Sequence, residues 1–216
     1  MINSIFPKIH KEGHKFLAIS ILITFFGLLM SKTIGFIFVL VTVWVYYFFR
    51  DPERISINND KFLVSPADGL VTDISEISGP PELNLENKTF TRISIFMNVF
   101  NCHVNRTPVS GNVEDIFYKP GKFLNASLDK ASEENERNYY KIKVIGTEDE
   151  IIIVQIAGLI ARRIVCEVNK NQQLKQGERI GMIRFGSRVD LYFNSKKILA
   201  KTGQNLTAGE SLIAEI

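Results

Sequence analysis

Two long runs without a charged residue dominate the N-terminal quarter of the chain. The first covers residues 16–30 and reads FLAISILITFFGLLM, the second covers residues 33–49 and reads TIGFIFVLVTVWVYYFF, and only Ser31 and Lys32 separate them. A membrane-spanning helix needs about 20 apolar residues, so each run is somewhat short when taken singly. Two arrangements fit: a tight helical hairpin that enters the membrane and returns, or two helices that lie deep in one leaflet.

The charges around these runs indicate an orientation. The flanking basic residues are Lys8, Lys11 and Lys15 before the first run and Arg50 and Arg54 after the second. The positive-inside rule puts both flanks in the cytoplasm, with Lys32 as the one basic residue that disagrees. A cleaved signal peptide is disfavoured because no AxA site follows. A hairpin buried in a globular protein is disfavoured because no segment is apolar enough to cover it. We expect residues 1–54 to hold the remainder at the cytoplasmic face of the cell membrane.

The remainder of the chain has a different composition, which excludes several classes of function. The whole chain carries 26 Lys+Arg and 23 Asp+Glu, for a net charge of +3, and residues 51–216 alone carry 21 basic and 22 acidic residues. This balance argues against a nucleic-acid partner. The two cysteines, Cys102 and Cys166, form no CxxC pair and are compatible with a reducing compartment. His103 is the only histidine after the apolar runs, so we expect no metal site built on several histidines.

Short β-rich runs alternate with turn residues from residue 55 onward. The runs cover residues 69–74, 92–97, 139–145, 151–156 and 179–185, and Gly, Pro and Asn separate them. No amphipathic helix of three turns is predicted in this region. The pattern therefore predicts that residues 55–216 form a mainly β domain, a compact sandwich or barrel. The turn-rich tail at residues 201–214 is typical of hammerhead domains, but it carries no MKM-type lysine for biotin or lipoate.

One short motif points to chemistry only when it is taken together with three others. Phe185-Gly186-Ser187 joins two strand-like runs, and alone it is weak because turns use Gly-Ser pairs constantly. The chain also contains SPADG at residues 65–69, MNVFNCHVNRTP at residues 97–108 and KPGK at residues 119–122. In this order and spacing, the four segments resemble the phosphatidylserine decarboxylase family, in its short bacterial and archaeal form.

The resemblance implies a proenzyme that cleaves itself between Gly186 and Ser187. Glycine before the bond leaves the carbonyl open to attack and tolerates a strained backbone. The Ser187 hydroxyl would attack the Gly186 carbonyl, and elimination from the resulting ester followed by hydrolysis would release ammonia and leave a covalent pyruvoyl group. The products would be a beta chain of residues 1–186 and an alpha chain of residues 187–216. We expect them to stay together as a heterodimer, because separation would open sheet edges.

The resemblance also implies the reaction. Family members convert phosphatidylserine to phosphatidylethanolamine in phospholipid biosynthesis, with the pyruvoyl ketone forming a Schiff base to the substrate amine and acting as an electron sink. Apolar runs at the N-terminus fit a substrate that stays in the bilayer. The alternative is a non-enzymatic, membrane-anchored hammerhead adaptor, in which the bond between Gly186 and Ser187 would remain intact.

Three further residues are candidates by residue-for-residue match. Asp68 matches an aspartate that assists self-cleavage, although an Asp before Gly is also a common turn residue. His103 matches the histidine linked to decarboxylation, and we assign it to proton transfer in that step. Long bacterial relatives carry a second histidine where this chain has Arg106. Self-cleavage here would therefore use Asp68 directly or through water, and Arg106 would be free to bind the substrate carboxylate or phosphate.

Overall fold

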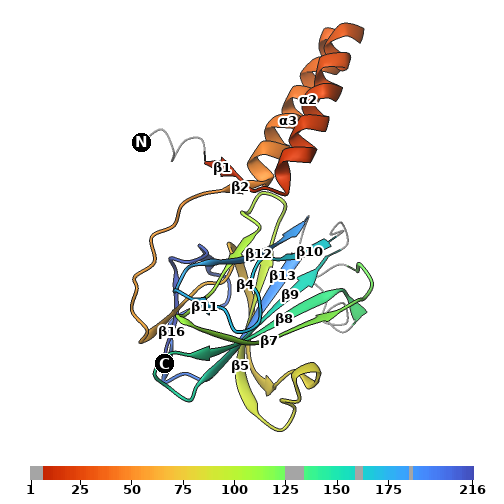
Figure 1. Cartoon of the computed structure of the whole chain (residues 1–216). Coiled ribbons are helices and arrows are strands. Elements are labelled where there is room, and N and C mark those ends of the chain that lie inside the picture. Colours follow the sequence, from red (N-terminus) through yellow and green to blue (C-terminus); the bar gives the residue numbers. More distant parts are fainter. Residues whose placement is uncertain (1–6, 125–133, 159–162, 185–186) are drawn as a thin grey trace. The chain divides into compact units, whose positions relative to one another are not determined.

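The computed structural model describes residues 7–124, 134–158, 163–184 and 187–216. The contacts between residues divide the chain into two compact units, Met1–Glu53 and Arg54–Ile216. Each unit is described on its own below. The first is a helical hairpin, and the second is built from β-strands (Figure 1).

The first unit is a helical hairpin with a short pair of strands at its base. Helix α2 covers Gly13–Met30 and helix α3 covers Lys32–Phe48, while β1 (Lys8–Ile9) pairs with β2 (Arg50–Asp51). The hydroxyl groups of Thr24 and Thr42 lie 2.8 Å apart across the hairpin, so the two helices are linked by a polar contact within an otherwise apolar surface. Small residues allow the helices to approach closely, since a side chain at Gly27 would collide with Phe38.

Most apolar side chains of this hairpin point outward. Leu29 and Met30 at the end of α2 are 69% and 78% exposed, and Phe36 in α3 is 61% exposed. By length and composition, α2 can cross a membrane, and α3 is a shorter apolar helix. An exposed apolar surface of this extent is typical of a membrane-contacting segment.

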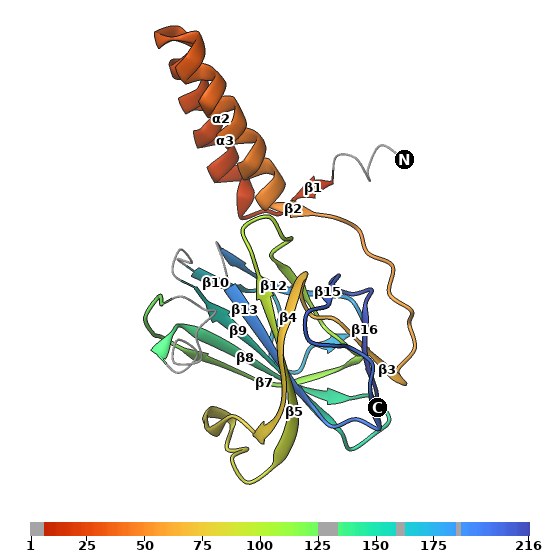
Figure 2. The same ribbon diagram turned by 180° about the vertical axis from the view of Figure 1, so that it is seen from behind.

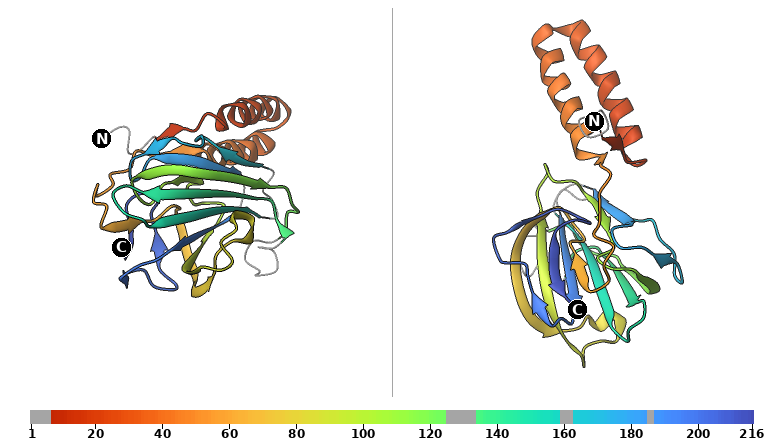
Figure 3. Two further views of the ribbon diagram at one scale, coloured as in Figure 1. Left: turned by 60° about the horizontal axis from the view of Figure 1, so that its bottom comes forward. Right: turned by 90° about the vertical axis from the view of Figure 1, so that its left-hand side faces the viewer.

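The second unit is organised around one antiparallel eight-stranded sheet. Its strand order is β11-β7-β8-β9-β13-β5-β4-β15, and the sheet curls into a half-barrel (Figure 3). The strands are β4 (Gly69–Ser78), β5 (Thr89–Met97), β7 (Gly111–Lys119), β8 (Arg137–Val144), β9 (Glu150–Ala157), β11 (Gln173–Leu174), β13 (Ser187–Phe193) and β15 (Asn205–Leu206).

Two three-stranded sheets complete this unit. One has the order β10-β12-β6 and the other β14-β16-β3 (Figure 2). Their strands are β10 (Arg163–Cys166), β12 (Arg179–Arg184), β6 (Val104–Arg106), β14 (Lys197–Ile198), β16 (Leu212–Glu215) and β3 (Phe62–Val64). A single turn of 3-10 helix, Pro81–Leu83, lies between β4 and β5. The expected mainly β domain, preceded by a helical hairpin, is confirmed.

Apolar clusters cover both faces of β9, and this explains the continuous apolar run in that strand. Ile151 and Ile153 belong to the main core, whereas Ile152, Val154 and Ile156 belong to a smaller cluster on the other face. Successive residues of a strand point to opposite faces, so a strand covered on both sides needs apolar residues throughout. Gln155 is the one polar residue in this run, and it is fully buried.

Candidate active site

The register of three neighbouring strands brings two predicted site residues to the same end of the large sheet. Phe96 in β5 pairs with Leu70 of β4 on one side and with Arg188 of β13 on the other. Ser187 pairs with Met97, and Asp68 is the residue immediately before β4. Strands β4 and β13 are two inter-strand spacings of about 4.8 Å apart, so the two backbones are roughly 10 Å from each other.

Ser187 is the first residue of β13 and is completely buried. Its Oγ donates a hydrogen bond to the Sδ of Met97 over 3.4 Å, and Ala157 of β9 lies opposite it on the other side. A thioether is a weak acceptor, so the hydroxyl group is held in place without a strong partner. Gly186, the other half of the predicted cleavage site, lies outside the described residues.

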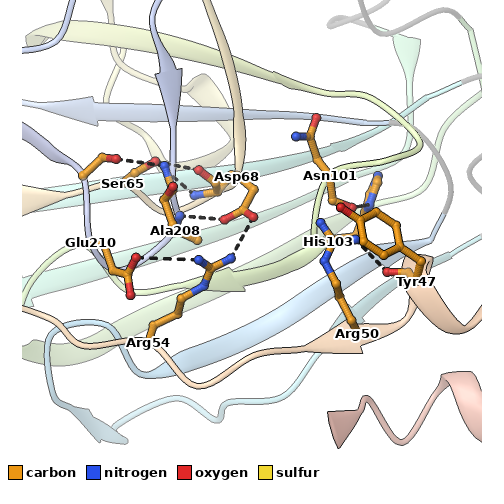
Figure 4. Close-up of polar contacts among 12 residues, drawn as sticks. Tyr47, Arg50, Arg54, Ser65, Asp68, Asn101, His103, Ala208 and Glu210 are labelled. Atoms are coloured by element: carbon orange, nitrogen blue, oxygen red, sulfur yellow. Dashed lines mark hydrogen bonds and ion pairs between the residues drawn. The ribbon is translucent and has the colours of Figure 1, made fainter. Parts of the chain in front are cut away.

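Asp68 is held by two strong hydrogen bonds (Figure 4). Its Oδ2 accepts a hydrogen bond from the guanidinium group of Arg54 over 2.8 Å, and its Oδ1 accepts the backbone N–H of Ala208 over 2.8 Å. Arg54 also lies 3.6 Å from the carboxylate of Glu210. The sequence places glycine after Asp68 because any side chain at Gly69 would collide with the carbonyl oxygen of Phe96 as β4 approaches β5.

His103 lies in the connection between β5 and β6 and is completely buried. Its Nδ1 is 3.0 Å from the carbonyl oxygen of Asn101, and its own carbonyl oxygen accepts the backbone N–H of Ile183 over 3.3 Å. Because a carbonyl oxygen only accepts, Nδ1 carries the proton, and Nε2 has the basic lone pair when the ring is neutral. Ile183 is near the end of β12, the strand that leads toward Ser187.

Arg106 lies at the end of β6 and is 5% exposed. Its Nη1 donates to the carbonyl oxygen of Gly177 over 2.8 Å, and its backbone N–H donates to the carbonyl oxygen of Pro66 over 2.9 Å. It lines an open groove of about 590 Å³ together with other cationic side chains, Arg54, Lys175 and Arg179. The structure thus brings Arg106 into a basic groove beside the Asp68 loop.

A buried chain of polar side chains, which the sequence analysis did not identify, reaches the site from inside the domain. Tyr140 donates to Oε1 of Gln155 over 2.8 Å, and Nε2 of Gln155 donates to Oδ1 of Asn105 over 2.8 Å. Nδ2 of Asn105 then contacts Sδ of Met97 over 3.7 Å, the same sulfur that accepts from Ser187. The lone glutamine in the apolar run of β9 was the available signal, because a buried amide needs hydrogen-bond partners.

Two further observations describe the groups around the buried chain. In the part of the chain that the structure describes, no group of three or more His, Cys, Asp or Glu side chains could hold a metal ion. Burial raises the pKa of the Tyr140 hydroxyl well above its ordinary value, and the thiol of Cys166 adds to this shift. Tyr140 is therefore protonated at neutral pH and acts as a donor in the buried chain.

Comparison with known proteins assigns a family to this site. The family model for phosphatidylserine decarboxylase matches residues 41–214. A phosphatidylserine decarboxylase proenzyme from Pelagibacter ubique is 65% identical over 215 residues, which cover all of both chains. Proenzymes of the same name from Cereibacter sphaeroides and Rickettsia typhi are 48% and 46% identical, over 100% and 99% of this chain and 93% and 92% of their own.

Proposed function

The chain belongs to the phosphatidylserine decarboxylase family, and we propose that it decarboxylates phosphatidylserine to phosphatidylethanolamine after cleaving itself between Gly186 and Ser187. Its family is one of enzymes, which removes the adaptor alternative. The observation that carries the proposal is the position of Ser187. It is the buried first residue of a central strand, and among the described residues its hydroxyl group has only a thioether as partner.

Self-cleavage requires Ser187 to lose its hydroxyl proton as Oγ attacks the carbonyl carbon of Gly186. A serine hydroxyl is a poor nucleophile until a base takes this proton. Asp68 is the candidate base, and Arg54 holds its carboxylate as an ion pair. Strand β4, which begins just after Asp68, and strand β13, which begins at Ser187, are separated by two strand spacings, roughly 10 Å, so a relay fits two short side chains better than direct contact. We infer that Asp68 acts through an intervening water molecule.

The surroundings of Ser187 fit the pyruvoyl group that would replace it. The pyruvoyl group would supply the electron sink for loss of carbon dioxide from the serine head group. The Cβ carbon of Ser187 would become its methyl group, and the Met97 side chain beside it is apolar and polarisable. A thioether can contact first a hydroxyl group and then a methyl group without leaving a strong polar partner unsatisfied.

His103 is proposed to transfer a proton during decarboxylation. Its Nδ1 is fixed as a donor to Asn101, which leaves Nε2 as the nitrogen that can take up and return a proton. Burial of the ring fixes its orientation, as a proton-transfer group requires. Arg106 is proposed to bind the carboxylate or phosphate of the substrate from the basic groove, where three other cations gather.

Cleavage before Ser187 would leave the two products interlocked. Strand β13 begins at Ser187 and lies between β5 and β9, pairing seven residues with β5 and six with β9. Near the C-terminus, the backbone N–H of Ala208 binds the carboxylate of Asp68. We therefore propose that residues 1–186 and 187–216 remain associated, because separation would open two sheet edges in the core.

The helical hairpin is proposed to hold the enzyme at the cytoplasmic face of the cell membrane, where its lipid substrate lies. The exposed apolar side chains of α2 and α3 support membrane insertion. Lys8 and Lys11 before α2, Lys15 in its first turn and Arg50 after α3 support a cytoplasmic position for both flanks. Under this proposal the substrate reaches the enzyme without leaving the bilayer.

The test of the proposed reaction is release of carbon dioxide from carboxyl-labelled phosphatidylserine in detergent micelles. We expect release by the purified full-length chain, and we expect it to stop after treatment with phenylhydrazine, which reacts with ketones. Phosphatidylcholine labelled in its head group is the control substrate, because it lacks both the carboxylate and the primary amine. No release from phosphatidylserine, or release that phenylhydrazine leaves unchanged, would contradict the proposal.

A further inference from the structure

In the buried chain from Tyr140 to Met97, each side chain donates a hydrogen bond to the next. Tyr140 donates to Gln155, and Gln155 donates to Asn105. Because the Oδ1 of Asn105 is used as the acceptor for Gln155, its Nδ2 must face Met97 and Ser187. The chain therefore fixes which end of the Asn105 amide is presented to the reaction centre.

The chain is strong at its inner end and weak at the outer end. The hydrogen bonds from Tyr140 to Gln155 and from Gln155 to Asn105 both measure 2.8 Å. The last contact, from Asn105 to the sulfur of Met97, measures 3.7 Å. Tyr140, Gln155 and Asn105 are all completely buried, where an incompletely satisfied amide is costly. The poorly satisfied group is the Nδ2–H of Asn105, which shares the sulfur of Met97 with the Ser187 hydroxyl. If the Ser187 oxygen gained negative charge, it would be a stronger acceptor for this N–H group than the sulfur is.

We propose that Asn105 positions a donor for self-cleavage: beside the sulfur of Met97, which both groups contact, its N–H group is presented to the hydroxyl group of Ser187. Its N–H group shares the sulfur acceptor with the Ser187 hydroxyl and stabilises the oxygen as its proton leaves. Gln155 contributes by preventing the Asn105 amide from turning over, since a turned amide would present an acceptor instead of a donor. This inference rests on the proposed self-cleavage.

The experiment follows cleavage of newly synthesised full-length chains into two fragments by gel electrophoresis, with thermal unfolding measured on the same proteins. Asn105→Asp keeps the size of the side chain and its acceptor for Gln155 but replaces the donor by a carboxylate. We expect cleavage to slow by at least about 10-fold at neutral pH, in line with the loss of one preorganised donor. Gln155→Leu, which does not touch Ser187, should also slow cleavage, by a smaller factor.

The pH dependence separates positioning from a merely structural role. Protonation of the new carboxyl group restores a donor, so the cleavage rate of Asn105→Asp should approach that of the unaltered chain as the pH falls. Val113→Ala, in the core on strand β7, is the matched control. It should lower the unfolding temperature and leave the cleavage rate within about twofold, because it lies outside the buried polar chain.

Three outcomes would overturn the inference. Cleavage of Asn105→Asp at the unaltered rate at neutral pH would show that the donor is not needed. If cleavage slowed in proportion to the loss of thermal stability in both Asn105→Asp and Val113→Ala, the role of Asn105 would be structural only. Both results would leave the proposed self-cleavage intact. If the unaltered chain itself is not cut, the proposed function fails, and the inference falls with it.

Discussion

Ser187 and Asp68 lie at the same end of one sheet, on strands either side of β5, yet the structure holds them in opposite ways. Asp68 accepts one charge-assisted and one backbone hydrogen bond, both of 2.8 Å. Within the described part of the chain, the Ser187 hydroxyl donates only to a sulfur atom, over 3.4 Å. Both side chains are buried, so the difference lies in their partners rather than in exposure to water.

The contrast indicates a division of labour. Under the proposed self-cleavage, Ser187 is the nucleophile, and it has only a weak hydrogen bond to lose before it reacts. A carboxylate bound by Arg54 has a fixed position, and it also ties the loop at residues 65–69 to the segment around Ala208. Asp68 therefore has a structural role whether or not it takes part in proton transfer, and mutations can separate the two roles.

Replacing Ser187 should have the largest effect and abolish both self-cleavage and decarboxylation. Ser187→Ala removes the nucleophile, so the chain should remain a single uncut, inactive polypeptide. The measurement is gel electrophoresis after expression, followed by the phosphatidylserine assay. Since the lost hydrogen bond to sulfur is weak, we expect the unfolding temperature of Ser187→Ala to stay close to that of the unaltered chain before cleavage. A cut or active variant would remove Ser187 from both roles.

Replacing His103 should separate cleavage from decarboxylation. His103→Gln keeps a polar side chain of similar size but cannot exchange a proton at neutral pH. We expect cleavage to proceed and the decarboxylation rate to fall by about 10²–10⁴-fold, the usual contribution of a general acid or base. Rates should be measured only on the fully cleaved protein. Full decarboxylation activity in that sample would exclude His103 from the reaction.

Replacing Asp68 should expose its two roles at once. Asp68→Asn keeps an acceptor for Ala208 but loses the ion pair with Arg54. We expect cleavage to slow by more than about 10-fold and the free energy of unfolding to fall by about 1–3 kcal/mol. Glu210→Gln is the control, because it weakens the other, more exposed partner of Arg54. Equal cleavage rates in these two variants would reduce Asp68 to its structural role.

Replacing Met97 should have the smallest effect. Met97→Leu removes the sulfur acceptor but keeps an apolar side chain of similar volume, an exchange that usually costs less than about 1.5 kcal/mol. Because the sulfur holds Ser187 only weakly, we expect cleavage within several-fold of the unaltered rate. The same cleavage assay measures this effect. A loss as large as that of Asp68→Asn would mean that the thioether is a required partner, and the contrast between the two regions would disappear.

The sequence predicted the broad fold because its signals were local. Charge-free runs predicted the hairpin, and short β-rich runs between turns predicted the mainly β unit. Asp68, His103 and Ser187 were predicted as site residues through family resemblance, not through spacing. Asn105, Gln155 and Tyr140 were missed because they meet only through the pairing of β8 and β9 and the packing of β6 against that sheet. Sequence periodicity carries no information about such contacts between distant segments.

The partners of each side chain were equally beyond prediction. In the sequence, Arg54 is one more basic residue after an apolar run. In the structure, it forms an ion pair with Asp68. The residue next to Asp68 in space, Ala208, is 140 positions away along the chain. Such pairings depend on strand order, which a single sequence leaves open among many topologies.

The most direct test of the central claim, that Ser187 becomes the reactive group, is the intact mass of the purified, detergent-solubilised protein. The account predicts two masses, one for residues 1–186 and one for residues 187–216 that is lighter than its serine form by one ammonia. A single mass for the uncut chain in a sample that releases carbon dioxide from phosphatidylserine would contradict it, as would a small fragment that retains its N-terminal serine in such a sample.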